Sequence, residues 1–387
     1  MPSIKKNPVL SAAPESQATA PVQARSRRGH GRVTLQNVAA QAGVTSITVS
    51  RYLRHPEVVA PATALRIQTA LSATGYLPNK QAGQLASGHS RMVAAIIPSI
   101  SNSIFSETVQ GLSDTLQASG YELMLASSGY SLEREEEQIR AVLAWSPSAL
   151  VVTGTHHTTG ALLLLNAAQR NGTPVIEVWD QPADANAEAV SLDAISQVGF
   201  NHHAVGRAMA EHLLSRGHRR LAYVDSGVVE DFRAHERGAG FRAAAREHSR
   251  THRRDPATVK LIKPPAGDAF ECGRLALAQI LALPGTPFTA NIAANITAAA
   301  FANDHLACGA LLEAQARGIQ VPAQIALMGF GDFPISRQLQ PPLSTVSPPR
   351  HEIGVQAAEV LLAALQSGTP PAHRALEWQM QIRESTG

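Results

Sequence analysis

The first periodic pattern of apolar residues lies between residues 34 and 54 and predicts two short helices. Apolar side chains recur in residues 35–42 at the i, i+3, i+4 and i+7 spacing of one helical face. Gly43 then breaks the pattern, as expected where the backbone needs a positive φ just past a helix. Thr45 is well placed to cap a second helix over residues 46–54. Two short helices joined by a turn with glycine form a helix-turn-helix, whose second helix can enter the major groove of DNA.

An ordinary helical hairpin inside a larger core would show the same spacing. Polar residues crowd the outer face of the second helix, however, at Ser46, Thr48, Ser50 and Arg51. A face of this composition suits contact with a polar partner better than burial, so we interpret the segment as a DNA-binding element.

The chain around these helices predicts a small amino-terminal domain, which we call the head, with a disordered arm before it and a short linker after it. A third helical pattern over residues 59–75 closes a three-helix head, and Pro78 follows, because proline disfavours helical backbone at the residue before it. Asn79 can cap a segment over residues 80–87 that is too short to be stable as an isolated helix. Residues 1–31 are rich in Pro, Ser, Ala and Gln without periodicity, which predicts a disordered arm.

From residue 91 the pattern changes to short apolar runs that alternate with helical stretches. The alternation runs from Met92 to Val178, restarts near Phe200, and ends with a helix over residues 351–366. Strands that alternate with helices of about ten to fifteen residues predict parallel sheets with right-handed crossovers. Two such sheets in sequence form two α/β lobes with a cleft, and ligands of such sheets bind at the carboxyl ends of the strands.

The charge of the chain is distributed unevenly. The net charge is +3, but residues 1–91 hold eleven Lys and Arg against two Glu, which leaves 22 basic and 28 acidic residues in the remainder. A basic head and an acidic body indicate that the head meets a polyanion and the body does not. The basic run at residues 25–32 adds nonspecific phosphate contacts, or it is a solvated leader without a role.

The number of cysteines and the lengths of the apolar runs indicate the cellular compartment in which the protein is expected. Cys272 and Cys308 are the two cysteines, too few for a disulfide framework, so we expect buried thiols in a reducing environment. The first thirty residues contain no apolar core of a signal peptide, and no apolar run approaches the length of a transmembrane helix. A soluble, cytoplasmic protein is therefore expected.

The sequence contains few residue patterns that are typical of an enzyme active site or a metal-binding site. The tandem pairs at His156 and His202 lack the i, i+4 spacing of helical metal ligands, so we interpret them as solvated surface histidines. The acidic run at residues 133–137 is interpreted as the solvated start of a helix, favoured by the macrodipole. Neither a glycine-rich phosphate loop nor a nucleophile elbow occurs, and we expect no catalytic residues, no metal and no cofactor.

Several motifs resemble those of one family of bacterial regulators. The head carries VTLQNVAAQAGVTSITVSRYL and GYLPN, and the body carries IIPSISNSIF, RGHRRLAYV, AND and GIQVPAQIALMGF. Together they resemble the lac repressor/galactose repressor family over about residues 32–385. Within that family SRYLRHPEVV, MLASSGY, EREEEQ, IEVWD and PPLSTVSPPR are most similar to the gluconate-operon repressor branch.

The resemblance implies a fold and its boundaries. It implies an α/β protein: a small three-helix DNA-binding head plus a two-lobed, periplasmic-binding-protein-like sensor domain with parallel sheets. The expected boundaries are a disordered arm at 1–31, the head at 32–78, a hinge helix or linker at 79–90 and the sensor at 91–387. Within the sensor, the N-lobe would comprise about 91–197 and 350–373, and the C-lobe about 198–348 and 374–387.

The resemblance also implies a homodimer, or a tetramer, bound to pseudo-palindromic operator DNA. Ser46 and Ile47 match the start of the recognition helix, where an apolar residue can contact a thymine methyl but not a hydrogen-bonding edge. Leu85 matches a hinge leucine that wedges into the minor groove, and Gly83 beside it departs from the family with a helix cost of roughly 1 kcal/mol. The DNA-binding set carried over is Thr34, Thr45, Ser46, Ile47, Thr48, Ser50, Arg51, Asn79, Ala82, Leu85 and Ala86.

In the cleft, the resemblance implies contacts to a small effector. The matching positions are Pro98, Asn102, Phe105, Asp180, Arg237, Phe270, Asn303, Asp332 and Arg350. Arg237 and Arg350 would place guanidinium groups on a carboxylate, which suits a sugar acid, although either arginine could instead form an ion pair between the lobes. Gly331 stands where the family often has an acid, which leaves the role of Asp332 open, and residues 289–298 form an extra segment to which the sequence assigns no role.

These features predict a sequence-specific transcriptional repressor whose operator affinity is controlled by a sugar or sugar acid, with gluconate or a related aldonate as the best candidate. A sugar-binding module without regulatory output is the alternative. A sugar-acid-processing enzyme is a third possibility, which the sequence supports least because it lacks a nucleophile or metal constellation.

Overall fold

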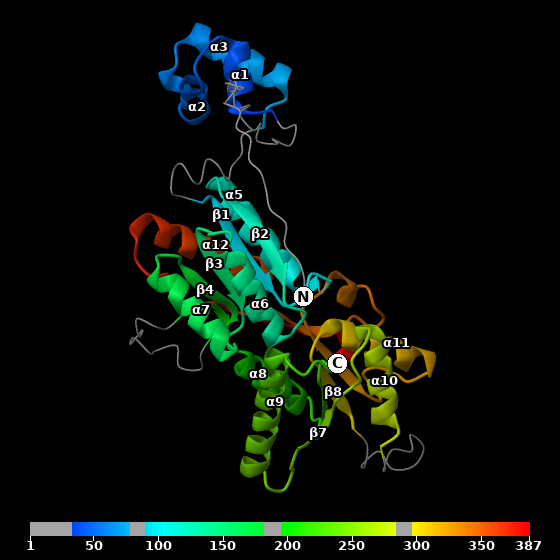
Figure 1. Cartoon of the computed structure of the whole chain (residues 1–387). Coiled ribbons are helices and arrows are strands. Elements are labelled where there is room, and N and C mark those ends of the chain that lie inside the picture. The colour runs from blue at the N-terminus through cyan, green and yellow to red at the C-terminus, as the bar shows by residue number, and fades with distance from the viewer. Residues whose placement is uncertain (1–32, 78–89, 102, 182–194, 284–295) are drawn as a thin grey trace, which may run out of the picture. The chain divides into compact units, whose positions relative to one another are not determined.

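The computed structural model describes residues 33–77, 90–101, 103–181, 195–283 and 296–387. The chain divides into two compact units, Met1–Ala86 and Ser87–Gly387. We describe each unit by itself (Figure 1).

The amino-terminal unit is a three-helix head. It contains α1 (Leu35–Ala42), α2 (Ser46–Arg54) and α3 (Pro61–Thr74), with a 3₁₀ turn at Pro56–Val58. Gly43 ends α1 with a φ of 65°, in the left-handed region that the sequence predicted. The helices enclose a small core of Val38, Ala39, Ala42, Val49, Ile67 and Ala70. The predicted three-helix arrangement is therefore confirmed.

The first lobe of the second unit is built on a parallel sheet with the strand order β11-β5-β4-β3-β1-β2. Its strands are β1 (Met92–Ile97), β2 (Glu122–Ser127), β3 (Ala149–Thr153), β4 (Val175–Asp180), β5 (Ser196–Phe200) and β11 (Arg374–Ala375). Its helices are α5 (Ser106–Ala118), α6 (Leu132–Leu143), α7 (Thr159–Arg170) and α12 (Arg350–Ser367). Gly111 of α5 faces the backbone of α12, where a Cβ would overlap the His351 carbonyl oxygen, so glycine permits this close helix packing.

The second lobe has the strand order β12-β10-β9-β8-β6-β7. Its strands are β6 (Arg220–Val224), β7 (Thr258–Ile262), β8 (Ala298–Phe301), β9 (Ala326–Phe330), β10 (Ser344–Ser347) and β12 (Gln379–Gln381). Its helices are α8 (His202–Ser215), α9 (Phe232–Thr251), α10 (Ala269–Leu281) and α11 (Asp304–Ala316). The strands pair in parallel except β12, which runs antiparallel to β10. Two parallel sheets in sequence confirm the predicted α/β class.

Three strands were missing from the sequence prediction. β5 has the sequence SQVGF and β12 has QMQ, so neither forms an apolar run, and β11 is only two residues long. β5 pairs with β4 as far as Phe200, and β11 pairs with β5. The chain therefore passes between the lobes a few residues beyond the expected limits of 197 and 373.

The topology brings the carboxyl ends of neighbouring strands to the cleft edge of each sheet. In the first sheet β1, β3 and β4 end at Ile97, Thr153 and Asp180. In the second sheet β8 and β9 end at Phe301 and Phe330. Within the described residues, no helix combines the length and apolarity needed to cross a bilayer. Cys272 and Cys308 are buried free thiols, as the sequence predicted.

Candidate functional site

The second helix of the head, α2, begins with a side-chain cap and is held by one buried residue. Thr45 Oγ1 accepts a hydrogen bond of 3.3 Å from the Thr48 amide, which confirms the predicted cap. Val49 is fully buried and anchors α2 to the other helices. Thr34 caps α1 through Asn37, whose Oδ1 accepts from the Thr34 amide at 2.8 Å. Both threonines thus fix helix starts while their surfaces stay exposed.

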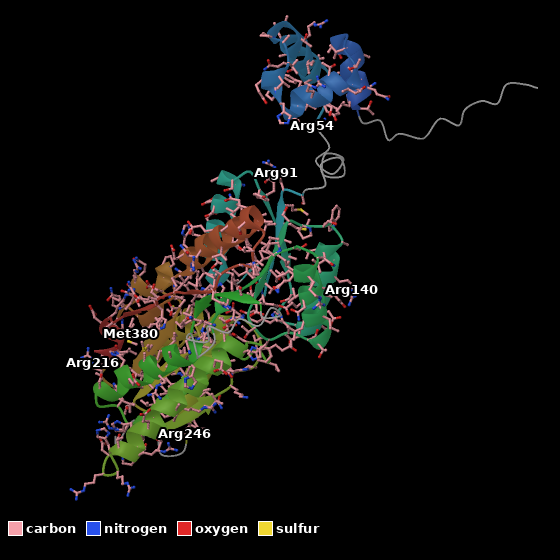
Figure 2. The ribbon with its side chains drawn as sticks, turned by 90° about the vertical axis from the view of Figure 1, so that its left-hand side faces the viewer. Arg54, Arg91, Arg140, Arg216, Arg246 and Met380 are labelled. Atoms are coloured by element: carbon pink, nitrogen blue, oxygen red, sulfur yellow. The ribbon has the colours of Figure 1, made fainter. Side chains whose placement is uncertain are left out.

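The outer face of α2 is a stripe of four side chains at helical spacing, Ile47, Ser50, Arg51 and Arg54, which we call the α2 stripe. Ile47 is 72% exposed, an unusual exposure for a large apolar residue. Arg54 (labelled in Figure 2) was not selected from the sequence. Its Nη2 donates to Ser50 Oγ at 3.2 Å. Its position seven residues after Ile47 was the signal that places it on this face. The stripe offers an apolar contact at one end and two guanidinium groups toward the other.

Some expected site residues lie outside the described part of the chain. These are Asn79, Ala82, Leu85 and Ala86 of the expected hinge, and Asn102 of the expected effector site. Gly83, the arm at 1–31 and most of the extra segment at 289–298 also lie outside it.

The cleft between the lobes of the second unit contains three adjoining cavities. The expected residues Phe105, Arg237 and Asn303 line one cavity, Pro98 lines the next, and Asp180 lines the third. Phe270, Asp332 and Arg350 line none of these three. Arg233, which was not selected from the sequence, lines all three.

Arg237 is buried, and neighbouring groups already occupy both of its terminal nitrogens. Nη2 donates to the Ala302 carbonyl at 2.8 Å, and Nη1 lies 2.9 Å from His202 Nδ1. The guanidinium also stacks 3.9 Å from the Phe330 ring centroid. Burial and the nearby Arg237 charge hold the pKa of His202 well below its usual value, so His202 is neutral. Its Nδ1 then accepts from Arg237, and its Nε2 donates to the Trp179 carbonyl at 3.0 Å.

Arg350 forms an ion pair within the first lobe, between α12 and α5, rather than the ion pair between the lobes that the sequence left open as an alternative. Its Nη2 lies 2.8 Å from Glu107 Oε1 and 3.4 Å from the Asp332 carbonyl oxygen. Glu107 belongs to α5 and Arg350 to α12, both in the first lobe, whereas Asp332 follows β9 in the second, so only the hydrogen bond to the Asp332 carbonyl crosses between the lobes. Arg350 therefore joins the two lobes.

Asp332 and Phe270 are engaged with protein groups away from the three cavities. Although burial opposes ionisation, hydrogen bonds from Arg337 and Arg383 hold the pKa of Asp332 below its usual value. Phe270 stacks on His305, with ring centroids 5.2 Å apart. Asn303 is partly engaged as well, because its Oδ1 caps α11 by accepting from the Leu306 amide at 3.0 Å.

Arg233 lies one helical turn before Arg237 on α9 and on the same face. Its side chain is 11% exposed, and its Nη1 lies 3.8 Å from Asp180 Oδ2, beyond hydrogen-bond distance. Its guanidinium carbon lies 5.8 Å from the Phe105 ring centroid. Burial raises the pKa of Asp180 to about 6, although the Arg233 charge opposes this shift. The i, i+4 spacing of the two arginines was the sequence signal for this residue.

His157 corrects the interpretation of the tandem histidines and of the acidic run. Its side chain is fully buried, with Nδ1 2.7 Å from Glu135 Oε2 and Nε2 3.3 Å from Glu177 Oε1. Burial favours the neutral ring, but the hydrogen bond with Glu135 and the nearby Glu177 carboxylate raise the pKa of His157 to about 9. The solvated-surface interpretation is wrong for His157 and for the buried His202, and the solvated-helix interpretation is wrong for Glu135. The partners come from α6 and β4, more than twenty residues away in one case, so local sequence carries no signal for them.

The cleft is nearly closed. The cavity lined by Pro98 and the cavity lined by Phe105 hold about 30 Å³ each, and the cavity lined by Asp180 holds about 170 Å³. At roughly 10–15 Å³ per water, each of the two smaller cavities has room for two or three water molecules. The lobes meet where the Leu132 amide donates to Glu230 Oε2 at 2.7 Å and where His156 stacks on Phe232. A ligand of six carbons therefore requires the lobes to separate or the side chains to move.

Comparison with known proteins identifies similar regulators. Residues 34–79 match the model described as bacterial regulatory proteins, lacI family, and residues 210–386 match a periplasmic binding protein-like domain. The HTH-type transcriptional regulator GntR of Pseudomonas aeruginosa is 37% identical over 361 residues, 93% of this chain and 97% of that protein. GntR of Escherichia coli K12 is 33% identical over 88% of this chain and 94% of that protein. The crystal structure of a LacI family transcriptional regulator from Silicibacter pomeroyi superposes with a TM-score of 0.77 at 30% identity, over 92% of this chain and 99% of that one.

Proposed function

The chain belongs to the lacI family of bacterial regulatory proteins and is a DNA-binding transcriptional repressor of the LacI and GntR type, and we propose that a small sugar acid controls its operator affinity from the interlobe cleft. Gluconate or a related aldonate is the proposed effector. The resemblance of several motifs to the gluconate-operon branch supports this choice.

Two arginines on one face of α9 carry the proposal of an acid. Arg233 and Arg237 both line the cavity that Phe105 and Asn303 also line, and both guanidinium groups are largely buried. A guanidinium binds a carboxylate through paired N–H···O bonds, and a buried positive charge favours an anion over a neutral sugar. The polar residues around them suit hydroxyl groups, which an aldonate carries on each remaining carbon.

The α2 stripe is the proposed DNA contact. Ile47 has the exposure needed to meet a thymine methyl in the major groove, and Arg51 and Arg54 have the charge to contact guanine edges or phosphates. The threonine caps at Thr34 and Thr45 would hold the ends of α1 and α2 against the backbone of the duplex. The segment at 79–90 is proposed as a hinge.

We further propose that the repressor acts as a cytoplasmic homodimer on a pseudo-palindromic operator. Closure or opening of the lobes around the effector would change the spacing of the two hinges. To switch the operator-bound form almost fully on or off, the effector must favour one state by roughly 5.5 kcal/mol.

The DNA-binding function is tested with a duplex from the region upstream of the gene. The protein is expected to shift a palindromic site there, with affinity falling steeply as salt rises because Lys and Arg contacts release counterions. A scrambled duplex of the same composition is the control. Equal binding of both duplexes at low salt would contradict the proposal of sequence-specific recognition.

The effector class is tested separately by thermal shift and calorimetry with the full chain. Gluconate, 2-ketogluconate and other aldonates are expected to raise the melting temperature more than glucose or glucitol at the same concentration. Neutral sugars that bind better than the acids would contradict the proposed class, whatever the outcome on DNA.

A further inference from the structure

Three arginines were candidates for holding the effector carboxylate, and two of them are already engaged. Arg237 has a partner at each terminal nitrogen, the Ala302 carbonyl and His202. Arg350 has Glu107 and the Asp332 carbonyl. A carboxylate could reach either guanidinium only by breaking buried hydrogen bonds, each of which costs free energy if a partner is left unpaired.

Arg233 is the exception among them. Its guanidinium makes no hydrogen bond with another described residue, and its contact with Asp180 spans 3.8 Å. It also borders all three cavities of the cleft, whereas Arg237 borders one. A largely buried guanidinium with unused N–H donors at the centre of a cleft is poised to bind an anion.

Gly154 provides the space that this guanidinium occupies. Gly154 follows β3 with a φ of 95°, a conformation that L side chains rarely adopt. A Cβ there would lie 2.7 Å from Arg233 Nη1 and 3.2 Å from Asp180 Oδ2. The end of β3 is therefore shaped to admit the Arg233 and Asp180 side chains from two different lobes.

We propose that Arg233 selects the acid: the effector's carboxylate binds its guanidinium and replaces Asp180 as the nearest anion. This assignment rests on the proposed function and transfers to Arg233 the role that the sequence gave to Arg237 and Arg350. Arg237 then positions His202 and the wall of the cavity, and Arg350 links the lobes.

The charged groups around Asp180 determine how binding changes when the effector's carboxylate replaces Asp180 beside Arg233. Arg233 and Arg237 of α9, His202 of α8, Glu177 of β4 and the Thr155 backbone all act on Asp180. An incoming carboxylate therefore meets Asp180 as a competitor for Arg233 and as a like charge. Removing that charge is expected to strengthen binding of the acid relative to binding of a neutral analogue.

The experiment compares gluconate with glucitol, its uncharged counterpart, by calorimetry on full-length variants. Arg233→Gln is expected to weaken gluconate binding roughly ten- to a hundredfold and to leave glucitol unchanged, because it removes one charged hydrogen-bonding partner. Arg233→Lys keeps the charge but not the paired geometry, and an intermediate loss is expected. Asp180→Asn is expected to tighten gluconate binding several-fold. Arg246→Gln, on the exposed face of α9, is the matched control and should match wild type (Figure 2).

The outcomes separate the two proposals. Wild-type protein that prefers gluconate, with the same preference in Arg233→Gln, overturns the assignment to Arg233 but leaves the effector class intact. Wild-type protein that binds neither compound, or prefers glucitol, overturns the effector class and the assignment together. Operator binding by Arg233→Gln in the absence of sugar reports that the variant is folded. If operator binding by Arg233→Gln is lost, the Asp180→Asn variant provides the deciding test. Weaker gluconate binding by Asp180→Asn would contradict the proposal that the carboxylate replaces Asp180 beside Arg233.

Discussion

The α2 stripe and the interlobe cleft present arginines in opposite ways. On α2, Arg51 and Arg54 are exposed, and the described partner of Arg54 is Ser50 within the same helix. In the second unit, Arg237 in the cleft and Arg350 outside its three cavities are buried, and their partners come from segments 18 to 243 residues distant. A surface arginine keeps its hydration until a partner arrives, whereas a buried one must be satisfied during folding. The stripe is therefore available for binding as it stands, and the cleft is available only where folding has left donors unused.

The largest effect on stability is expected for a substitution of His157, beside the cleft. This substitution tests the contrast between buried groups near the cleft and the exposed α2 stripe. Replacing it by Gln leaves Glu135 and Glu177 buried together without their cation, and we expect a loss of about 3 to 5 kcal/mol of stability. Urea unfolding followed by tryptophan fluorescence measures this loss. His351→Gln, on the exposed face of α12, is the control and should change stability by less than about 0.5 kcal/mol.

The same histidine makes stability depend on pH. Its folded pKa of about 9 lies above the ordinary value of 6.5, so its contribution is fully present below pH 6.5 and is lost as pH rises through 9. The shift corresponds to about 3 kcal/mol. Unfolding free energies measured between pH 6 and 9.5 should fall in the wild type and change less in His157→Gln. Parallel profiles would show that His157 is not charged in the folded state.

A smaller effect, confined to DNA binding, is expected for the α2 stripe. Arg51→Gln or Arg54→Gln should leave stability within about 0.5 kcal/mol of wild type, because both side chains are exposed. Operator affinity should fall roughly tenfold, and a residue that contacts phosphate should reduce the salt slope by about 1. Titrations at several salt concentrations measure both quantities. A stability loss as large as that of His157→Gln would break the contrast between the two regions.

An effect of similar or smaller size is expected from pH on effector binding. Asp180 has a pKa of about 6, so lowering the pH from 7.5 to 5.5 neutralises the charge that competes for Arg233. His202 stays neutral across this range, because its pKa lies well below its usual value. Gluconate binding should tighten roughly three- to tenfold in wild type. Asp180→Asn should show a flat profile, and equal profiles in the two proteins would exclude Asp180 as the titrating group.

The smallest effect is expected at Ile47. Ile47→Ala should change stability by less than about 0.5 kcal/mol, because this side chain is 72% exposed and adds little to the core of the head. Its proposed contact is a thymine methyl, so the substitution should relax preference at one base pair of the operator. Binding to a set of single-base operator variants measures this preference. An unchanged preference at every position would place Ile47 outside the DNA interface.

The contrast also explains what the sequence could predict. Gly43 and Thr45 act on backbone within three residues of themselves, so local patterns located α1 and α2 correctly. Strands with apolar runs were found for the same reason, whereas β5 and β11 depend on pairing with strands distant in sequence.

The location of the cleft could be predicted from the sequence, but the contacts that its side chains make could not. Phe105, Arg237 and Asn303, which the sequence proposed for one effector site, line the same cavity. The partner of Arg350, the burial of His157 and the unused donors of Arg233 each depend on a side chain from another element. A residue type indicates what a side chain can bind, but only the fold determines whether a neighbour has already bound it.

The near closure of the cleft has a consequence for the timing of the response. With about 30 Å³ in each of the two smaller cavities, and with Glu230 and His156 joining the lobes, a six-carbon ligand would need an opening of the cleft to enter or leave these two cavities. The entry rate of such a ligand would then level off at the opening rate as its concentration rises, and its residence would be long compared with that in an open groove. If the proposed effector binds there, a repressor with this cleft would average over brief fluctuations of that effector and would respond to its sustained supply.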